Sequence, residues 1–289
     1  MDLQAITDLV GAVSVPLFAV TSMAAVGLRQ TVRQFIAPLR SGWLLVSGAL
    51  ANFLVAPCLA LALTALLPIP EDARMGLMVL ACAAGAPFAL KLTHLARGDM
   101  PSASALLAVM LVATTLFMPV VLPLLLPGAE VSSASIAAVL IPTMLLPLGA
   151  AIAVRQFSPG LAARLQGPVQ RLSFWSMLVM PANQFIADHR ELAGLIGTGT
   201  VLAIVVFTLA NLVAGWALGT MKPGVGPIVG ISASQRNMGV ATLVAVANFG
   251  DSSAVVTVVL AGFLALILLL PLTWLAGRAG SGRAAVTVS

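Results

Sequence analysis

The chain of 289 residues has few charged residues, two cysteines and no tyrosine. Charged residues make up 8% of the chain and hydrophobic residues 60%, whereas soluble domains are about 25% charged. A soluble enzyme and a nucleic-acid-binding module are therefore excluded. Cys58 and Cys82 lie in separate apolar segments, so they indicate neither a disulfide framework nor a metal site.

The sequence does contain repeated apolar segments, each near the 20 residues or so that cross a bilayer. Proline, glycine and charged residues separate them, and no connector is long enough to form a further domain. We expect an all-α polytopic membrane protein with a single transmembrane transporter domain over residues 1–289. Nine transmembrane helices are predicted: Leu9–Leu28, Trp43–Leu67, Met75–Ala96, Ala103–Leu126, Ile136–Val154, Leu172–Ile186, Leu195–Leu218, Val225–Ala247 and Ala254–Ala276. No basic region precedes the first apolar run, so a cleaved signal peptide is not expected.

Charged residues alternate between the connectors. With the N-terminus outside, the outer connectors hold two basic residues, Arg74 and Arg190, and every acidic residue except Asp99. Ten basic residues fall inside: Arg29, Arg33, Arg40, Arg97, Arg155, Arg164, Arg171, Lys222, Arg278 and Arg283. The positive-inside rule then predicts a protein of the cell's inner (plasma) membrane with a cytoplasmic C-terminus. Anionic lipid head groups account for the basic charge, so no nucleic-acid partner is expected.

The two remaining basic residues, Lys91 and Arg236, fall within predicted spans, and no acidic residue lies deep in any span. Ionisable residues inside the membrane are costly and are by default functional. No nucleophile with a base, metal cluster or phosphate-binding loop accompanies them. We therefore expect neither an enzyme nor a cofactor nor a metal centre.

Two predicted spans contain helix-breaking sequences. The third holds Gly85-Ala86-Pro87, and the eighth holds a polar run from Ser232 to Asn237. Such breaks are tolerated in a membrane where they line a cavity or pack inside protein. The two spans are five apart, and so are the second and seventh, which share Leu50-Ala51-Asn52 and Leu209-Ala210-Asn211. The odd offset predicts inverted repeats, residues 1–127 and 128–289 (the second with one extra helix), an architecture of many secondary transporters.

Three motifs resemble the bile acid:sodium symporter family. They are Asn52-Phe53-Leu54-Val55-Ala56-Pro57, Leu95-Ala96-Arg97-Gly98-Asp99 and Arg236-Asn237-Met238-Gly239-Val240-Ala241. The likeness spans nearly the whole chain, with the first helix of ten-helix members missing. It implies a core and a panel domain, with two broken helices crossing in the core. It also implies transport of small or amphipathic organic anions coupled to two sodium ions.

The sodium ligands that the resemblance implies are largely replaced in this chain. The family's glutamate falls on Ser232, its second-site glutamine on Arg236, and a further glutamine on Asn52. The other ligand positions are apolar: Ala89, Leu90, Leu107 and Leu111. Sodium needs several oxygen ligands, which apolar side chains do not supply. We therefore expect sodium-independent transport, in which Lys91 and Arg236 stand in for the two ions.

Several roles remain open for these residues. Arg236 could instead contact an anionic substrate or serve packing, and Lys91 has the same alternatives. Proton coupling is a further alternative for Lys91, because a lysine inside a protein can lose its proton. The residues expected to line the substrate cavity are Thr93, Ser232, Ser234, Gln235, Asn237 and Asn52.

The sequence thus predicts a secondary carrier that moves a small or amphipathic organic anion by alternating access. A sodium- or proton-coupled symporter of the same family is the first alternative. A channel or a non-transporting membrane receptor is an alternative of another class. Membrane lipid and the anion are the expected partners, and no oligomeric state is predicted.

Overall fold

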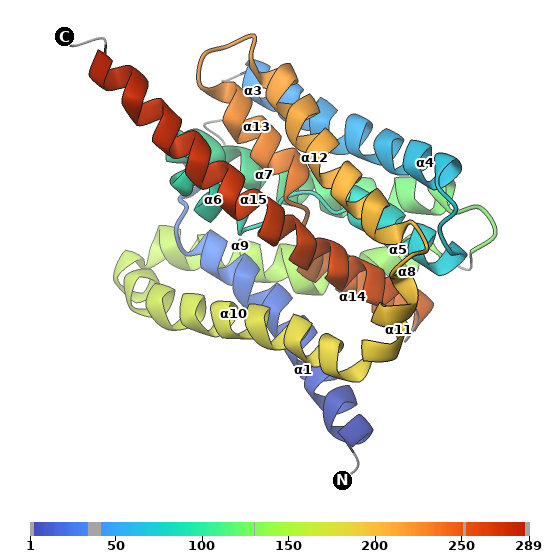
Figure 1. Cartoon of the computed structure of the whole chain (residues 1–289). Helices are drawn as coiled ribbons and strands as arrows, with labels where there is room; N and C mark the ends of the chain where they lie inside the picture. Colours follow the sequence, from blue (N-terminus) through green and yellow to red (C-terminus); the bar gives the residue numbers. More distant parts are fainter. Residues whose placement is uncertain (1–2, 34–41, 130, 251–252, 287–289) are drawn as a thin grey trace.

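The computed structural model describes residues 3–33, 42–129, 131–250 and 253–286, with side chains as far as Arg278. All secondary structure in these residues is helical (Figure 1). Six helical stretches among them are long and apolar enough to cross a membrane: Gln4–Gly27, Gly42–Leu66, Met100–Leu125, Ser133–Phe157, Thr200–Gly219 and Ser253–Arg278. The all-α polytopic class is confirmed, while the count of nine membrane crossings stays a prediction.

None of the three other predicted spans coincides with one apolar helix. The third consists of α5 (Glu71–Cys82) and α6 (Ala89–Leu95), and the eighth of α13 (Val225–Ser234) and α14 (Met238–Phe249). The sixth forms part of α10 (Pro159–Ala187), which begins at Pro159 rather than Leu172. Proline suits the first turn of a helix, and the additional residues of α10 include Arg164 and Arg171, which lower its apolar character.

Glycine is required at the first break, between α5 and α6. Gly85 has φ +78°, a left-handed conformation that costs other residues about 1–2 kcal/mol. A Cβ atom at this position would also lie 2.9 Å from the backbone nitrogen of Leu111 on α7 (Met100–Leu125). The break therefore depends on a residue without a side chain, both for its turn and for its close packing.

Two helices contain a widened turn, and a proline follows each. The turn η2 (Leu50–Val55) separates α3 (Gly42–Ala49) from α4 (Ala56–Leu66), where Pro57 follows. The turn η3 (Ile141–Leu145) separates α8 (Ser133–Leu140) from α9 (Leu146–Phe157), where Pro147 follows. A proline ring clashes with the carbonyl one turn earlier in a regular helix, and a widened turn accommodates it. The turn η2 is the one that carries the buried Asn52.

The helices form two groups (Figure 1). One group, the three-helix group, consists of α1 (Leu3–Gly27), α9 and α10, which pack against one another. The other group, the main bundle, contains α3 to α7, α12 (Thr200–Gly219), α13, α14 and α15 (Ser253–Val286). The helix α8 leads from the main bundle into α9, and α11 (His189–Leu195) follows α10. The groups touch where α1 meets α14 and α10 meets α15.

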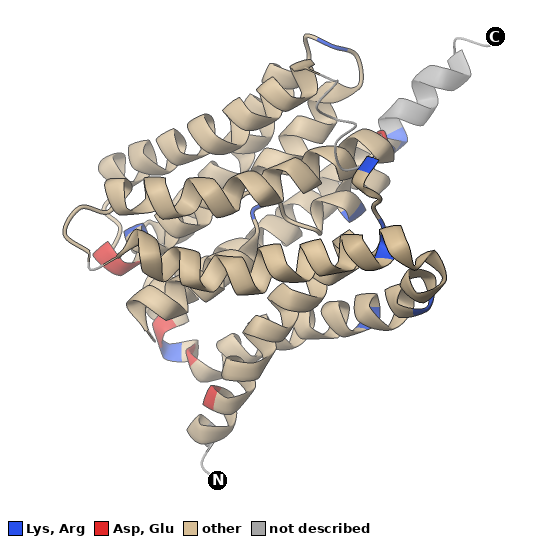
Figure 2. Ribbon diagram, turned by 180° about the vertical axis from the view of Figure 1, so that it is seen from behind, with Lys and Arg blue, Asp and Glu red and all other residues tan. Residues whose placement is uncertain are grey.

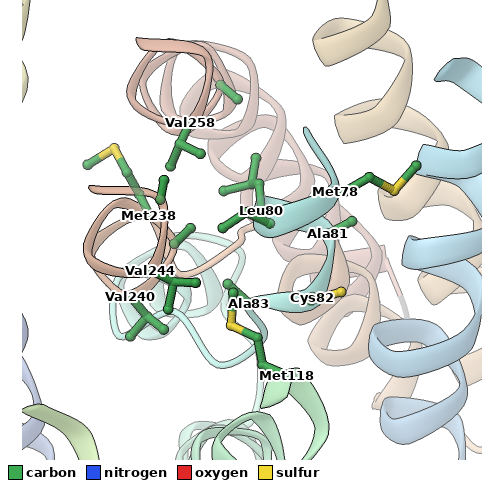
Figure 3. Close-up of a cluster of buried hydrophobic side chains, with 14 of the residues drawn as sticks. Met78, Leu80, Ala81, Cys82, Ala83, Met118, Met238, Val240, Val244 and Val258 are labelled. Carbon is green, nitrogen blue, oxygen red and sulfur yellow. The ribbon is translucent and has the colours of Figure 1, made fainter. Parts of the chain in front are cut away.

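Small and medium side chains hold the main bundle together. Met78 and Leu80 of α5, Met118 of α7 and Val240 of α14 meet in one buried cluster, which Val258 of α15 completes (Figure 3). Gly215 of α12 faces Gly230 of α13. A Cβ atom added to Gly215 would lie 2.9 Å from the Cα atom of Gly230. Helices in a membrane gain stability mainly from such close contact. The segment before the second break is therefore held tightly against α12.

The charges separate along the bundle (Figure 2). Most acidic residues lie at the end that holds the N-terminus, and most basic residues lie toward the end from which α15 projects. This distribution agrees with the alternation read from the sequence, and which end is cytoplasmic stays a prediction. Asp2, Arg40, Glu130 and Asp251 lie outside the described residues, as does the side chain of Arg283.

Candidate functional site

The two breaks lie directly against each other. The backbone nitrogen of Asn237, in the second break, donates a hydrogen bond to the carbonyl oxygen of Ala83 in the first, at 2.9 Å. Its side-chain nitrogen donates to the carbonyl oxygen of Gly85 at 3.0 Å. The side-chain oxygen of Asn237 accepts from the backbone nitrogen of Val240 at 3.3 Å, which caps the start of α14. One residue thus joins both breaks and begins the helix that follows.

Arg236 reaches from the second break to the end of α5. Its side chain is only 2% exposed. The Nε atom donates to the carbonyl oxygen of Leu80 at 3.2 Å, and Nη2 donates to that of Ala81. These carbonyls belong to the last turn of α5, where helix carbonyls lack partners and carry partial negative charge. The guanidinium therefore supplies both hydrogen bonds and compensating charge to the end of this helix.

Asn52 completes the contacts of Arg236. Its side-chain oxygen accepts from Nη1 of Arg236 at 2.8 Å, and its backbone carbonyl accepts from Nη2 at 3.4 Å. Its side-chain nitrogen donates to Gly48 O at 2.9 Å and to Ser232 Oγ at 3.3 Å. Three predicted site residues, Asn52, Ser232 and Arg236, therefore form one buried network. Every acceptor recorded for Arg236 is a carbonyl or amide oxygen, and none is a carboxylate.

Two other predicted site residues bond within their own helices. The hydroxyl of Ser234 donates to the carbonyl oxygen of Gly230 at 2.8 Å, and the hydroxyl of Thr93 donates to that of Ala89 at 2.9 Å. Ser232 and Ser234 lie in the helical turns of α13, and not in the break that their polar run indicated. Serine hydroxyls that bond back to the previous turn are compatible with a helix, which is why the helix continues through them.

Three of the four apolar positions that the resemblance gives to sodium are closely packed, whereas Leu90 is half-buried. Ala89, Leu107 and Leu111 are 8%, 3% and 1% exposed. A void of about 10 Å³ remains beside Ala89 and Leu107, with Thr93 and Ser232 as its polar neighbours. The described residues contain no cluster of three or more His, Cys, Asp and Glu side chains. These two hydroxyls are fewer than the several oxygen ligands that sodium needs, so the side chains beside this void do not by themselves complete a sodium site.

A cavity of about 590 Å³ lies between the two helical groups. The walls are mainly apolar and come from α1, α7, α10, α15 and both breaks. Its polar lining includes Arg29, Gln30, Lys91, Gln235 and Arg236. A volume of this size, with mainly apolar walls and a few polar groups, is typical of a small-molecule site.

Lys91 lies on the wall of this cavity and is exposed. Its ammonium nitrogen stands 4.6 Å from the ring centre of Phe174 on α10 and 5.3 Å from that of Phe88. Arg29, just beyond α1, is also exposed and donates through Nη2 to Gln170 of α10. Lys91 and Arg236 therefore have different surroundings: Lys91 is exposed to the cavity, whereas Arg236, which also borders it, is buried and bonded to carbonyl and amide oxygens.

Comparison with known proteins identifies the family. The chain matches the model of the Sodium Bile acid symporter family over residues 16–194. The chain belongs to this family. The matched residues include the first break and end before the second, so membership does not depend on the segment that carries Arg236.

The relatives that this chain resembles are distant. The "Uncharacterized sodium-dependent transporter YocS" of Bacillus subtilis (strain 168) is 24% identical over 245 residues, covering 81% of this chain and 74% of that protein. The "Probable sodium/metabolite cotransporter BASS5, chloroplastic" of Oryza sativa subsp. indica is 23% identical over 203 residues, covering 68% and 50%. The chain thus spans about half the length of the rice relative. Membership makes this protein a membrane transporter of a small molecule, in agreement with the prediction that it is no enzyme.

Sequence reasoning missed part of the cavity. The sequence predicts Arg29 only as a connector charge and does not indicate Gln30, Phe88 or Phe174 as cavity residues. Phe174 lies on α10, far in sequence from the breaks, and its place beside Lys91 depends on how the two groups pack. One feature of the sequence could have indicated Arg29 and Gln30: they are two consecutive polar residues directly after an apolar span.

Proposed function

We propose that this protein is a secondary carrier of a small or amphipathic organic anion that works by alternating access without sodium. The observation that supports it is the environment of Arg236, which is buried and bonded to oxygens of Leu80, Ala81 and Asn52. These oxygens belong to the last turn of α5, directly before the first break, and to the widened turn η2. A guanidinium thus provides, as part of the chain, the positive charge that the family is expected to take from its second sodium ion.

The chemistry of Arg236 suits this replacement. Arginine stays charged and presents five donors in a planar fork, so it can satisfy several carbonyls together. A sodium ion near it would be repelled, by about 4 kcal/mol for unit charges 4 Å apart at an effective dielectric constant of 20. Together with the apolar residues at the other ligand positions, this repulsion argues against a sodium ion at the second site.

Lys91 supports the anion side of the proposal. It was predicted as a stand-in for the first sodium ion, but its exposed ammonium at the cavity wall favours the alternative of direct contact with the anion. Arg29 lies on the same cavity. Arg29 directly follows α1 at its predicted cytoplasmic end, and Lys91 lies in α6, the half of its broken helix that is nearer to that side.

The predicted topology belongs to the same proposal. It comprises nine transmembrane helices, inverted repeats, an outside N-terminus and a cytoplasmic C-terminus in the inner membrane. We interpret the three-helix group as the panel and the main bundle as the core, with α5–α6 and α13–α14 as the crossing broken helices. The hydrogen bonds between the breaks and the separation of charges support this interpretation.

Counterflow in proteoliposomes tests the proposal. A panel of carboxylates and sulfonates is measured in sodium and in choline medium, at matched ionic strength and pH. We expect saturable exchange of at least one anion at equal rates in both media. If no anion exchanges, the proposal of a carrier is wrong, and the alternative of a receptor or channel is favoured. A steep, saturable dependence on sodium contradicts sodium independence.

A second candidate is a coupled symporter. Two relatives, named as a sodium-dependent transporter and a probable sodium/metabolite cotransporter, favour sodium coupling. In that case the ion would bind through carbonyls and hydroxyls alone. Proton coupling through Lys91 is distinguished in the same assay, because uptake would then depend on pH in the wild type and not in Lys91→Met.

A further inference from the structure

One face of α10 contacts two positive charges on the cavity wall. Gln170 accepts a hydrogen bond from Nη2 of Arg29, and the ring centre of Phe174 lies 4.6 Å from the ammonium nitrogen of Lys91. Gln170 and Phe174 are four positions apart in the helix, so they lie on one face, a turn apart. The ring centre of Phe88 lies 5.3 Å from the same ammonium nitrogen, and all five residues line the cavity.

These contacts hold the two cations without neutralising them. An amide oxygen and an aromatic ring attract a cation but carry no net charge. Among the described residues, neither Arg29 nor Lys91 forms an ion pair with an acidic side chain. A carboxylate in the place of Gln170 or Phe174 would hold the same cations and cancel their charge. Both positive charges therefore remain available to a bound anion.

The contacts also restrict two long side chains before a ligand arrives. Arg29 and Lys91 are exposed, and side chains of these types lose more rotamer freedom than most when a ligand orders them. Contacts that order them beforehand reduce this cost of binding. Because Lys91 is exposed and its ammonium has three donors, an anion can bind it while the rings stay in place.

The two contacts differ in the helical groups that they join. Lys91 belongs to α6 of the main bundle, whereas Phe174 belongs to α10 of the three-helix group. Arg29 directly follows α1, so its bond to Gln170 lies within the three-helix group. The position of the Lys91 charge therefore depends on how the two groups pack, and that of Arg29 on one group alone.

We infer that Phe174 and Gln170 are positioning residues, which hold Lys91 and Arg29 in the orientation that binds the charged group of the anion. The inference rests on the proposed function and adds residues that act on the anion through another side chain. It requires that the effect of each positioning residue disappears when its cation is removed.

A double-mutant cycle tests Phe174. Binding of 3-phenylpropanoate to the full chain in nanodiscs is measured by calorimetry, with the cation 3-phenylpropylammonium as the control for charge. Phe174→Leu should weaken binding of the anion about 2- to 5-fold, the equivalent of one exposed cation–π contact. Phe174→Tyr keeps a ring and should bind like the wild type. In the Lys91→Met background, Phe174→Leu should cause no further weakening.

A neutral probe separates this role from direct contact between the ring and the ligand. The alcohol 3-phenylpropan-1-ol has the same apolar body without the charge, so Phe174→Leu should leave its binding unchanged. If the alcohol is weakened as much as the anion, or if Phe174→Leu still weakens the anion in Lys91→Met, Phe174 contacts the ligand body and is no positioning residue.

Gln170 provides an independent test on the other cation. Gln170→Met removes the acceptor at similar volume, so it should weaken binding of 3-phenylpropanoate in the wild type and not in the Arg29→Met background. This pair of variants serves alone if Phe174→Leu does not give a monodisperse protein. Phe157→Leu and Gln156→Met, at exposed positions of α9 outside the cavity, are the matched controls and should bind normally.

The outcomes separate the inference from the proposed function. If no anion binds the wild type, or if 3-phenylpropylammonium binds as well as 3-phenylpropanoate, the proposed anion carrier is wrong and the inference is wrong with it. If the anion binds and both Phe174→Leu and Gln170→Met bind it as well as the wild type or more tightly, only the inference is overturned.

Discussion

The two breaks are built from opposite kinds of residues. The first, between α5 and α6, contains Ala83-Ala84-Gly85-Ala86-Pro87-Phe88 and offers backbone carbonyls. The second, between α13 and α14, contains Gln235-Arg236-Asn237 and offers side-chain donors. Carbonyls of Leu80, Ala81, Ala83 and Gly85 accept from Arg236 and Asn237, and that of Ala84 accepts from Thr114 at 3.2 Å.

This difference shows how two similar interruptions can support each other. Unpaired carbonyls inside a membrane are costly unless a neighbour provides donors. The first break could be made from small residues, which permit close approach, because the second one brings the hydrogen-bond donors. Among the described residues that make hydrogen bonds between the two breaks, Arg236 is the one with a charged side chain.

The largest effect is expected from removing that charge. Arg236→Ala should lower stability by about 1–3 kcal/mol for each buried acceptor left without a donor. Thermal or denaturant unfolding in detergent measures the loss, with Arg164→Ala, exposed on α10, as the control. Equal unfolding of the two variants would show that the guanidinium does not hold the breaks together.

Asn237→Ala should have the next largest effect. It removes the bond to Gly85 and the cap of α14, and loss of such a cap alone costs about 0.5–2 kcal/mol. Asn237→Ser keeps a capping oxygen and loses the amide donor without adding a charge, so its unfolding midpoint should lie between those of wild type and Asn237→Ala. A Ser variant as unstable as the Ala variant would mean that the cap contributes little.

Gly85→Ala tests the backbone of the first break. The left-handed φ costs about 1–2 kcal/mol for a residue with a Cβ atom, and the close approach to Leu111 adds to it. Gly128 also has positive φ, +95°, but nothing lies within 4 Å of an added Cβ. Gly85→Ala should therefore unfold at a lower temperature than Gly128→Ala. Equal unfolding temperatures of the two variants would show that the close contact with Leu111 does not contribute.

Lys91→Met should affect stability least, because exposed cation–π contacts contribute about 0.5–1 kcal/mol. Its effect should instead fall on the anion, since the variant removes a positive charge from the cavity wall. Calorimetry with 3-phenylpropanoate should show weaker binding in Lys91→Met and near-normal binding in Lys91→Arg. The opposite result, lost stability with unchanged binding, would make Lys91 a structural residue like Arg236.

Much of the architecture could be predicted from the sequence. Long apolar segments predicted the all-α membrane class, since a bilayer demands such helices. Gly85 and Pro87 indicated the first break, because their backbone preferences act locally. The second break was placed too early, at Ser232, since a serine hydroxyl can bond within a helix and need not interrupt it. Residues 159–171 were left out of α10 because the prediction followed apolar character alone.

The candidate site was predictable only in part. The sequence by itself placed Arg236 and Lys91 within predicted apolar spans, and its resemblance to the family predicts that most of the family's sodium ligands are replaced. Tertiary structure alone decided that Arg236 bonds to Asn52, 184 positions away, and to the carbonyls of α5. It also decided that Lys91 faces a cavity together with Gln30 and Phe174. The physical reason is that every residue carries the same backbone carbonyl. Hydrogen-bond acceptors that are backbone carbonyls therefore cannot be recognised from the residue types in the sequence.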